Sequence, residues 1–351
     1  MASFSQFGND LYTGKRSFDI VGRRKLWSRI ALVMVICAIA LPFFRGGFQF
    51  GIEFRGGSEF QVAGLSAPLD TGIAESTVIE VTGDTAPRIS SVGDTAIRVQ
   101  TSQLTNDDSD ALQSALATAY DVPIDQVSAS FIGATWGQDI TAQAVRGLVA
   151  FLVLAGIVMA LYFRTWKMSA AAMIALLHDL VITAGVYGIL GFEVTPAAVI
   201  GLLTILGYSL YDTVVVFDKV RENTGENGDA SRRTFSESVN LAVNQTLVRS
   251  INTSVVALLP VASILFIGSL VLGAGTLRDI SLALFIGILI GTYSTIFLAA
   301  PIYAQLRERE PDIAKHSKRT LAARAESRIA GDAVAAGPVG ADPVAGTTRT
   351  T

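Results

Sequence analysis

Long apolar blocks separated by short polar segments dominate the pattern of hydrophobic and polar positions in this chain of 351 residues. A helix of roughly 20 apolar residues crosses a bilayer core about 30 Å thick. Six blocks reach that length, and we predict membrane-spanning helices near residues 26–44, 145–163, 168–190, 196–217, 247–272 and 277–303. The pattern therefore predicts an α-helical membrane protein with six transmembrane helices.

The first of these blocks has an alternative interpretation as a cleaved signal peptide. Ala38-Ile39-Ala40 follows a basic region and resembles a cleavage site. However, the apolar run continues through residues 41–44, and Pro42 would fall directly after the cut. We therefore favour an uncleaved first helix.

Residues 46–141 lie between the first two predicted helices and are numerous enough to form a small folded domain. Alternating apolar and polar positions predict strands at 59–62, 88–92, 96–100 and 126–132, and helices are predicted at 72–81 and 106–119. Strands alternating with two helices favour one external α+β domain of the ferredoxin-like kind. An ordered spacer without a role of its own is the alternative.

The basic residues indicate the orientation in the membrane. Lys and Arg flank the N-terminal side of the first helix, the connections at 164–167 and 219–233, and the segment after 303, whereas the loops 191–195 and 273–276 carry none. Cytoplasmic loops of membrane proteins carry an excess of Lys and Arg. We therefore predict a multi-pass protein of the cytoplasmic membrane with both termini in the cytoplasm and the domain between the first two helices outside.

The two ends and the outer domain differ in composition. Residues 1–25 form a basic cytoplasmic N-terminus, while the outer domain carries 13 acidic residues and only three basic ones. Residues 304–351 form a cytoplasmic tail that becomes rich in Ala, Gly, Thr and Pro. That composition predicts a largely disordered tail, especially beyond residue 329.

The overall composition excludes several function classes. The hydrophobic residues make up 50% and the charged residues 16% of the chain, so an ordinary soluble enzyme is not expected. One Cys and two His cannot form an intrachain disulfide framework or a Cys/His zinc site. A net charge of −3 predicts no nucleic-acid partner.

A phosphate-binding loop is also rejected. Five residues separate Gly8 from Gly14 where four are required, and Arg16 follows Lys15 in place of Ser or Thr. Without an ATP site, and without a nucleophile paired with a base, the chain is not expected to be an enzyme and needs no cofactor. The membrane potential is then the available energy source, worth about 2.3 kcal/mol per unit charge and 100 mV.

Ionisable residues inside the membrane are therefore the main functional candidates. Asp212 lies inside the fourth predicted helix, and Arg249 lies at a similar depth in the fifth, within a polar helix start that includes Asn252 and Thr253. An Asp that gains and loses a proton, facing an Arg that cannot, would form a gate controlled by protonation. We expect these four residues to form a pathway for a coupling cation, H⁺ in our interpretation, and the alternative is a static buried pair that fixes helix packing.

Three further residues are secondary candidates. His178 and Asp179 would extend a proton relay, although a hydrogen-bonded packing histidine explains the pattern equally well. Asp218 lies at the inner boundary of the fourth helix, where we favour a salt bridge with Arg221 or Lys219. The glycines at 56, 57, 133 and 137 are candidate hinges for the outer domain, because Gly accepts positive φ at little cost.

Three blocks resemble the SecF family of protein-export membrane proteins of the bacterial Sec system. They are Gly51-Ile52-Glu53-Phe54-Arg55-Gly56-Gly57 after the first helix, the segment 207–223 around Asp212, and the segment 244–254 around Arg249. The resemblance extends from the basic N-terminus to about residue 305. Glu53 stands where the family has Asp, and Tyr211 stands where it has Asn.

The resemblance implies partners and a mechanism. It implies a SecD subunit with a similar six-helix core, association with the SecYEG channel, unfolded secretory polypeptides as substrate, and contact with membrane lipids. It further implies that Asp212 and Arg249 serve proton passage in a late, cation-driven step of translocation. A half-unit of a proton-coupled exporter of small solutes or lipids is the alternative, and a non-transporting scaffold would not need Asp212.

Overall fold

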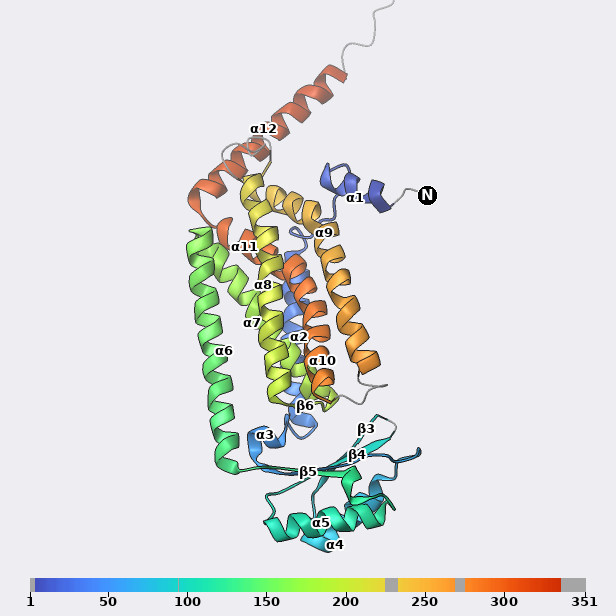
Figure 1. Ribbon diagram of the computed structural model, residues 1–351. Helices are drawn as coiled ribbons and strands as arrows, with labels where there is room; N and C mark the ends of the chain where they lie inside the picture. Colours follow the sequence, from blue (N-terminus) through green and yellow to red (C-terminus); the bar gives the residue numbers. More distant parts are fainter. Residues whose placement is uncertain (1–3, 94, 225–232, 269–274, 336–351) are drawn as a thin grey trace, which may run out of the picture.

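The computed structural model describes residues 4–93, 95–224, 233–268 and 275–335. Figure 1 shows a bundle of long helices with a small sheet domain at one end. The first helix, α1 (Phe4–Tyr12), and the last, α12 (Pro311–Ala335), lie at the opposite end of the bundle. The two ends of the described chain are therefore on the same side, as an even number of membrane crossings requires.

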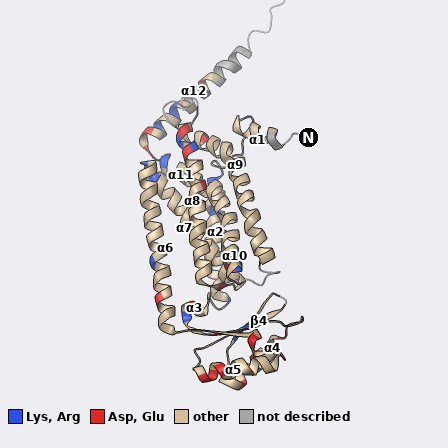
Figure 2. Cartoon of the chain, in the orientation of Figure 1, with Lys and Arg blue, Asp and Glu red and all other residues tan. Residues whose placement is uncertain are grey.

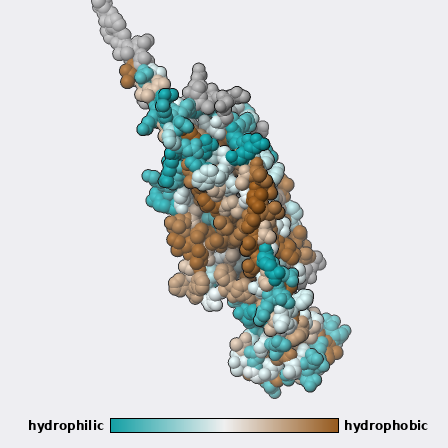
Figure 3. Space-filling model, turned by 90° about the vertical axis from the view of Figure 1, so that its left-hand side faces the viewer, coloured by the Kyte–Doolittle hydropathy of each residue, from teal (hydrophilic) through white to brown (hydrophobic). Residues whose placement is uncertain are grey.

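Six helical segments in the described ranges are long and apolar enough to cross a membrane, which confirms the predicted number. They are α2 (Arg24–Phe44), α6 (Ala134–Phe163), α7 (Trp166–Leu190), α8 (Pro196–Thr224), α9 (Phe235–Ser263) with the π-turn η3 (Ile264–Gly268), and α10 (Gly275–Ser294) with the π-turn η4 (Thr295–Ala299) and α11 (Ala300–Arg307). Figure 3 shows the corresponding apolar belt between two hydrophilic ends.

Two helices begin about three turns before the predicted spans. α6 begins at Ala134 instead of 145, because residues 134–144 mix polar and apolar side chains but continue the helix outside the apolar belt. The outer sheet accordingly ends at Ile132, before the expected boundary at 141. α9 begins at Phe235 instead of 247, where Thr234 and Glu237 form a capping box that hydropathy alone does not detect.

The outer domain is a four-stranded antiparallel sheet covered by two helices. Its elements are β2 (Gly57–Val62), α4 (Thr71–Thr82), β3 (Arg88–Val92), β4 (Ala96–Thr101), α5 (Asn106–Ala119), the 3₁₀ turn η1 (Ile124–Gln126) and β5 (Val127–Ile132). The strand order is β3-β4-β2-β5, and each neighbouring pair is antiparallel. This βαββαβ arrangement confirms the predicted ferredoxin-like α+β domain.

The two faces of this sheet serve different purposes. Phe60 of β2 pairs with Val99 of β4, and both are fully buried in the core beneath α4 and α5. The preceding pair, Glu59 with Gln100, points to the opposite face because side chains alternate along a strand. That polar face lies toward the helix bundle, while α4 and α5 cover the far side (Figure 1).

Two short strands connect the outer domain to the bundle. β1 (Gln49–Phe50) follows α2, and it pairs in parallel with β6 (Glu193–Val194) in the loop between α7 and α8. The short helix α3 (Ile52–Arg55) then packs against the outer end of α6. A Cβ atom added at Gly137 would lie 2.8 Å from the Phe54 carbonyl oxygen, so glycine permits this close approach.

Two asparagines of α9 hold the chain before α2 at the other end of the bundle. The Asn240 Oδ1 accepts hydrogen bonds from the backbone N–H groups of Ile20 (2.9 Å) and Val21 (3.0 Å). The Asn244 side chain is buried, and its Oδ1 accepts from the N–H of Phe18 at 2.7 Å. Residues 8–12 of the rejected phosphate-loop motif lie on the helix α1.

The prediction of a largely disordered tail is wrong for residues 311–335, which form α12. This segment is rich in Ala, Lys and Arg, which favour helix, and Asp312 lies in its first turn. The Arg324 guanidinium donates two hydrogen bonds to the Glu237 carboxylate of α9, at 2.7 and 2.8 Å. The rest of the predicted tail, residues 336–351, lies outside the described residues.

Candidate functional site

The polar face of α8 carries the main candidate, Asp212. The residue is only 4% exposed, and no basic side chain among the described residues forms an ion pair with it. The Ser250 hydroxyl of α9 donates a hydrogen bond to the Asp212 Oδ1 at 2.9 Å. The Asp212 Oδ2 is buried and has no hydrogen-bond partner in the described ranges. One carboxylate oxygen is therefore available for a proton or a water molecule.

Arg249 does not pair with Asp212 in this conformation. No ion pair joins the two residues in the part of the chain that the structure describes, and the Arg249 side chain is exposed on the outside of the bundle. Asn252 is exposed as well, and Thr253 donates to the Arg249 carbonyl oxygen of its own helix at 2.9 Å. Tyr211, next to Asp212, is 55% exposed. Arg249, Asn252 and Tyr211 thus form an outward-facing set at membrane depth.

Asp179 occupies a second buried position, in α7. It is 2% exposed, and its Oδ2 accepts hydrogen bonds from the hydroxyls of Ser209 (2.5 Å, α8) and Ser294 (2.8 Å, α10). The His178 Nδ1 lies 3.2 Å from the Asp179 Oδ1, and the buried His178 Nε2 has no partner among the described residues. The hydroxyl oxygens of Thr213 and Thr295, both buried, lie 3.0 Å apart. We call Asp179, Asp212 and the side chains bonded to them the buried network.

The structure corrects the interpretation of Asp218. Its Oδ2 accepts a hydrogen bond from the Tyr162 hydroxyl of α6 at 2.7 Å. Lys219 instead pairs with Glu222 at 2.6 Å, and no salt bridge to Asp218 occurs within the described ranges. Adjacent helix positions point in directions about 100° apart, so sequence proximity did not decide this pairing.

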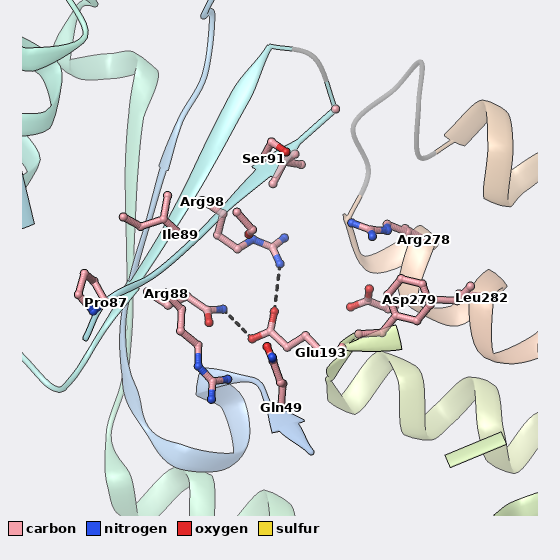
Figure 4. A pocket seen from close by; sticks show the side chains of 16 residues that line it. Gln49, Pro87, Arg88, Ile89, Ser91, Arg98, Glu193, Arg278, Asp279 and Leu282 are labelled. Carbon is pink, nitrogen blue, oxygen red and sulfur yellow. Dashed lines mark hydrogen bonds and ion pairs between the residues drawn. The ribbon is translucent and has the colours of Figure 1, made fainter. Parts of the chain in front are cut away.

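A polar cavity of about 400 Å³ separates the outer domain from the bundle (Figure 4). The edge strand β3 with Arg88 forms one side, and the first turn of α10 with Arg278 and Asp279 forms the other. Glu193 projects between them from β6. It accepts a hydrogen bond from the Gln100 amide at 2.7 Å and lies 3.5 Å from the Arg98 guanidinium.

Arg98 and Gln100 connect this cavity to the sheet. Both also contact Glu59 of β2, Arg98 at 3.5 Å and Gln100 at 2.9 Å, so each bridges β2 to β6. Two of the three basic residues of the otherwise acidic outer domain, Arg88 and Arg98, line the cavity. Figure 2 shows acidic residues, in red, on α5 of this domain. We call Glu53, Glu59, Arg98, Gln100 and Glu193 the outer junction.

Within the motif 51–57, Glu53 contributes a third carboxylate to the outer junction. Burial raises the pKa of the Glu53 carboxyl, and the nearby carboxylates of Glu193 and Glu59 raise this pKa further. The Glu53 Oε2 has no hydrogen-bond partner in the part of the chain that the structure describes. The junction therefore carries three carboxylates against the single guanidinium of Arg98.

The glycines of the motif permit close contacts. Gly56 has φ +78°, and a Cβ added there would lie 2.9 Å from the Ala134 Cα. Gly57 has φ +146°, and its added Cβ would lie 2.6 Å from the Thr101 carbonyl oxygen. Gly51 begins α3 as its N-cap. In this conformation the glycines serve dense packing, and hinge motion at these positions stays a prediction.

Among the described residues, no group of three or more His, Cys, Asp or Glu side chains is arranged to hold a metal ion. The buried network instead offers two carboxylates, an imidazole and several hydroxyls. These groups bind and exchange protons.

The fold and this site together define a multi-pass helical membrane protein with a ferredoxin-like outer domain and acidic residues buried inside the helix bundle. Comparison with known proteins identifies its family. The model of the family "protein export membrane protein SecD/SecF, C-terminal" matches residues 112–309. The chain belongs to the SecD/SecF family.

Curated relatives match over almost the whole chain. It is 44% identical to the protein translocase subunit SecF of Streptomyces coelicolor over 333 residues, which cover 95% of this chain and 88% of the relative. Identity to SecF of Pseudomonas aeruginosa is 30%, with coverage of 85% and 94%.

A solved structure is also similar to this chain. The crystal structure of SecDF from Thermus thermophilus, described as a translocon-associated membrane protein, matches 84% of this chain with a TM-score of 0.73 and 28% identity. The chain covers 39% of that longer SecDF chain.

Proposed function

We propose that this chain is the SecF subunit of the Sec protein-export machinery, and that with SecD it uses the proton-motive force to drive late steps of polypeptide translocation. The observation that carries the proposal is Asp212, a buried carboxylate with one oxygen unpartnered in the described structure, in the middle of a membrane-spanning helix. A carboxylate at that depth costs on the order of 3 kcal/mol or more, which is typical of a functional residue.

SecD would cover the outward-facing set Arg249, Asn252 and Tyr211. A guanidinium exposed to lipid at membrane depth is unfavourable, and a second helical core packed against α8 and α9 would remove it from lipid. The SecYEG channel, unfolded secretory polypeptides and membrane lipids complete the partners in this proposal. With both termini in the cytoplasm, the acidic outer domain faces the side where the exported polypeptide emerges.

The proton cycle would act through Asp212. A proton arriving from outside neutralises its carboxylate and lowers its attraction for the nearby positive charge of Arg249. Release of the proton inward restores the negative charge, and the two residues then attract each other again. This alternation would shift α8 against α9, and the β1–β6 connection would transmit the movement to the outer domain.

The test is the export rate against an imposed proton gradient, in vesicles that carry this chain together with SecD. Asp212→Asn imitates the protonated carboxyl at nearly constant shape, so we expect normal insertion and SecD binding but no response to the gradient. Arg249→Lys keeps the charge and loses the planar fork, and should also be impaired. A parental gradient response of Asp212→Asn would show that this carboxylate is only structural.

A further inference from the structure

We propose that Asp179 is a second proton-binding carboxylate in the membrane, and that it exchanges protons with Asp212 through the hydroxyl of Ser209. The inference rests on the proposed function, because it extends the proton path beyond Asp212. It assigns a role to the most deeply buried carboxylate in the described part of the bundle, which the gate of Asp212 and Arg249 does not use.

The surroundings of Asp179 are those of a titrating group more than of a packing residue. Hydroxyls from two other helices and the adjacent imidazole surround its carboxylate, and no Arg or Lys forms an ion pair with it in the described ranges. His178 is 6% exposed, yet its Nε2 lacks a hydrogen-bond partner in the described structure. Leaving a buried polar atom unpaired is unfavourable, so a histidine kept only for packing is a poor explanation.

The other polar groups facing this site also suggest space for water. The Tyr293 ring of α10 lies 6.1 Å from the His178 ring, and the Tyr293 hydroxyl is buried without a partner among the described residues. The same holds for the Asp212 Oδ2. Buried polar atoms of this kind are usually satisfied by ordered water. The network would therefore be hydrated when it conducts.

Depth places the groups in a consistent order. Counted from the outer ends of α7 and α8, Asp179 lies about 17 Å, Ser209 about 20 Å and Asp212 about 24 Å into the bundle at 1.5 Å per residue. A proton moving from the outside to the inside would meet Asp179 before Asp212. Arg249 does not intervene, since its side chain is exposed on the outer surface of α9.

Ser209 provides the connection. Its hydroxyl contacts Asp179 at 2.5 Å, and it lies three residues before Asp212, so both residues share one face of α8. A hydroxyl has one donor hydrogen and two acceptor lone pairs. Protonated Asp179 gives its proton to the Ser209 oxygen while Ser209 passes its own hydrogen toward Asp212, directly or through one water. Asp179 loses a proton, Asp212 gains one, and Ser209 is unchanged.

Two threonines form a further buried hydrogen bond between α8 and the segment after α10. Thr213, the residue after Asp212, contacts Thr295. Thr295 in turn follows Ser294, whose hydroxyl donates a hydrogen bond to Asp179. Thr295 begins the π-turn η4, and such turns inside helices often occur at functional sites.

The experiment measures proton flux into vesicles that contain the full chain with SecD, under an imposed pH gradient. We expect Asp179→Asn to lower the flux on the order of a hundredfold, the size typical for loss of a proton-transfer group. Ser209→Ala should lower it less, about tenfold, since water can replace a hydroxyl. Thr246→Val is the matched control. Thr246 is buried in α9, and within the described ranges its hydroxyl bonds only to carbonyl oxygens of its own helix, so the flux of this variant should equal the parent's.

The variants distinguish a failure of this inference from a failure of the proposed function. If Asp212→Asn conducts like the parent, the proposed function fails. If Asp212→Asn is inactive but Asp179→Asn and Ser209→Ala conduct like the parent, only the role of Asp179 fails. A flux carried by Na⁺ instead of H⁺ would also overturn it.

A spectroscopic readout covers the case in which Asp179→Asn does not fold. Infrared difference spectra recorded as the pH is lowered are compared between the parent complex and the variants: one carboxyl band should disappear in Asp212→Asn, and a second should shift in Asp179→Glu, which should keep part of the flux. A single band that Asp212→Asn removes would mean that Asp179 does not bind a proton, and the inference would be wrong.

Discussion

The buried network and the outer junction are built from similar side chains but in opposite environments. In the bundle, Asp179 and Asp212 are almost completely buried and contact hydroxyls and one imidazole. At the junction, Glu59 and Glu193 are about one fifth exposed and share Arg98 and Gln100. Arg98 offsets part of the negative charge at the junction, where water can screen the rest, whereas neither carboxylate of the buried network has a guanidinium or ammonium partner in the described ranges. Groups that must change their charge therefore belong in the buried network, and groups that attach a domain belong at the outer junction.

The largest expected effect tests how tightly the outer domain is joined to the bundle. Gly57→Ala forces a side chain into positive φ and against the Thr101 carbonyl oxygen, so it should destabilise the junction by about 3 kcal/mol. Gly93→Ala is the control: its φ is +62°, but no atom lies within 4 Å of the added Cβ, so about 1 kcal/mol is expected. Thermal unfolding and protease sensitivity of the outer domain measure both. Equal effects would show that close packing at Gly57 is unimportant.

The next prediction separates stability from function in the buried network. Asp212→Leu removes a buried carboxylate with an unpartnered oxygen, so the free energy of unfolding should stay constant or rise by about 1–2 kcal/mol while the response to a proton gradient is lost. The melting temperature of the purified chain measures stability. A clear loss of stability would place the network with the structural contacts and weaken the contrast with the junction.

At the junction the opposite result is expected. Arg98→Ala leaves Glu59 and Glu193 without their guanidinium and should cost about 1 kcal/mol, less at high salt because both partners are partly exposed. A double-mutant cycle with Glu193→Gln isolates the coupling. A coupling energy near zero at low salt would mean that Arg98 does not hold the domain to β6.

The smallest effect concerns pH. Because the folded protein raises the Glu53 pKa above its ordinary value of 4.5, the folded junction binds this proton more tightly than the unfolded chain does. Its contribution to stability is complete below pH 4.5 and is lost as the pH rises through the raised value. Glu53→Gln should remove this part of the pH dependence and change stability at neutral pH by less than about 1 kcal/mol. An unchanged pH profile would assign the dependence to another group.

Much of the architecture follows from the sequence because it depends on local patterns. The six spans, the strand at 88–92 and the helix at 106–119 were predictable, since hydropathy and alternation act over a few residues. The capping box at Thr234 was also visible in the sequence and would have placed the start of α9 correctly. The start of α6 was not, because its first turns are helical but mix polar and apolar side chains.

The sequence by itself determined which ionisable residues enter the membrane, but only the tertiary structure decided what each of them meets. Arg249 and Ser250 are adjacent, yet rotation by about 100° per residue turns Ser250 toward Asp212 and Arg249 outward. Asp179 gains partners from α8 and α10, and Glu193 meets a strand almost a hundred positions earlier in the chain. Composition and period are properties of one segment, whereas these contacts depend on how helices rotate and pack against each other.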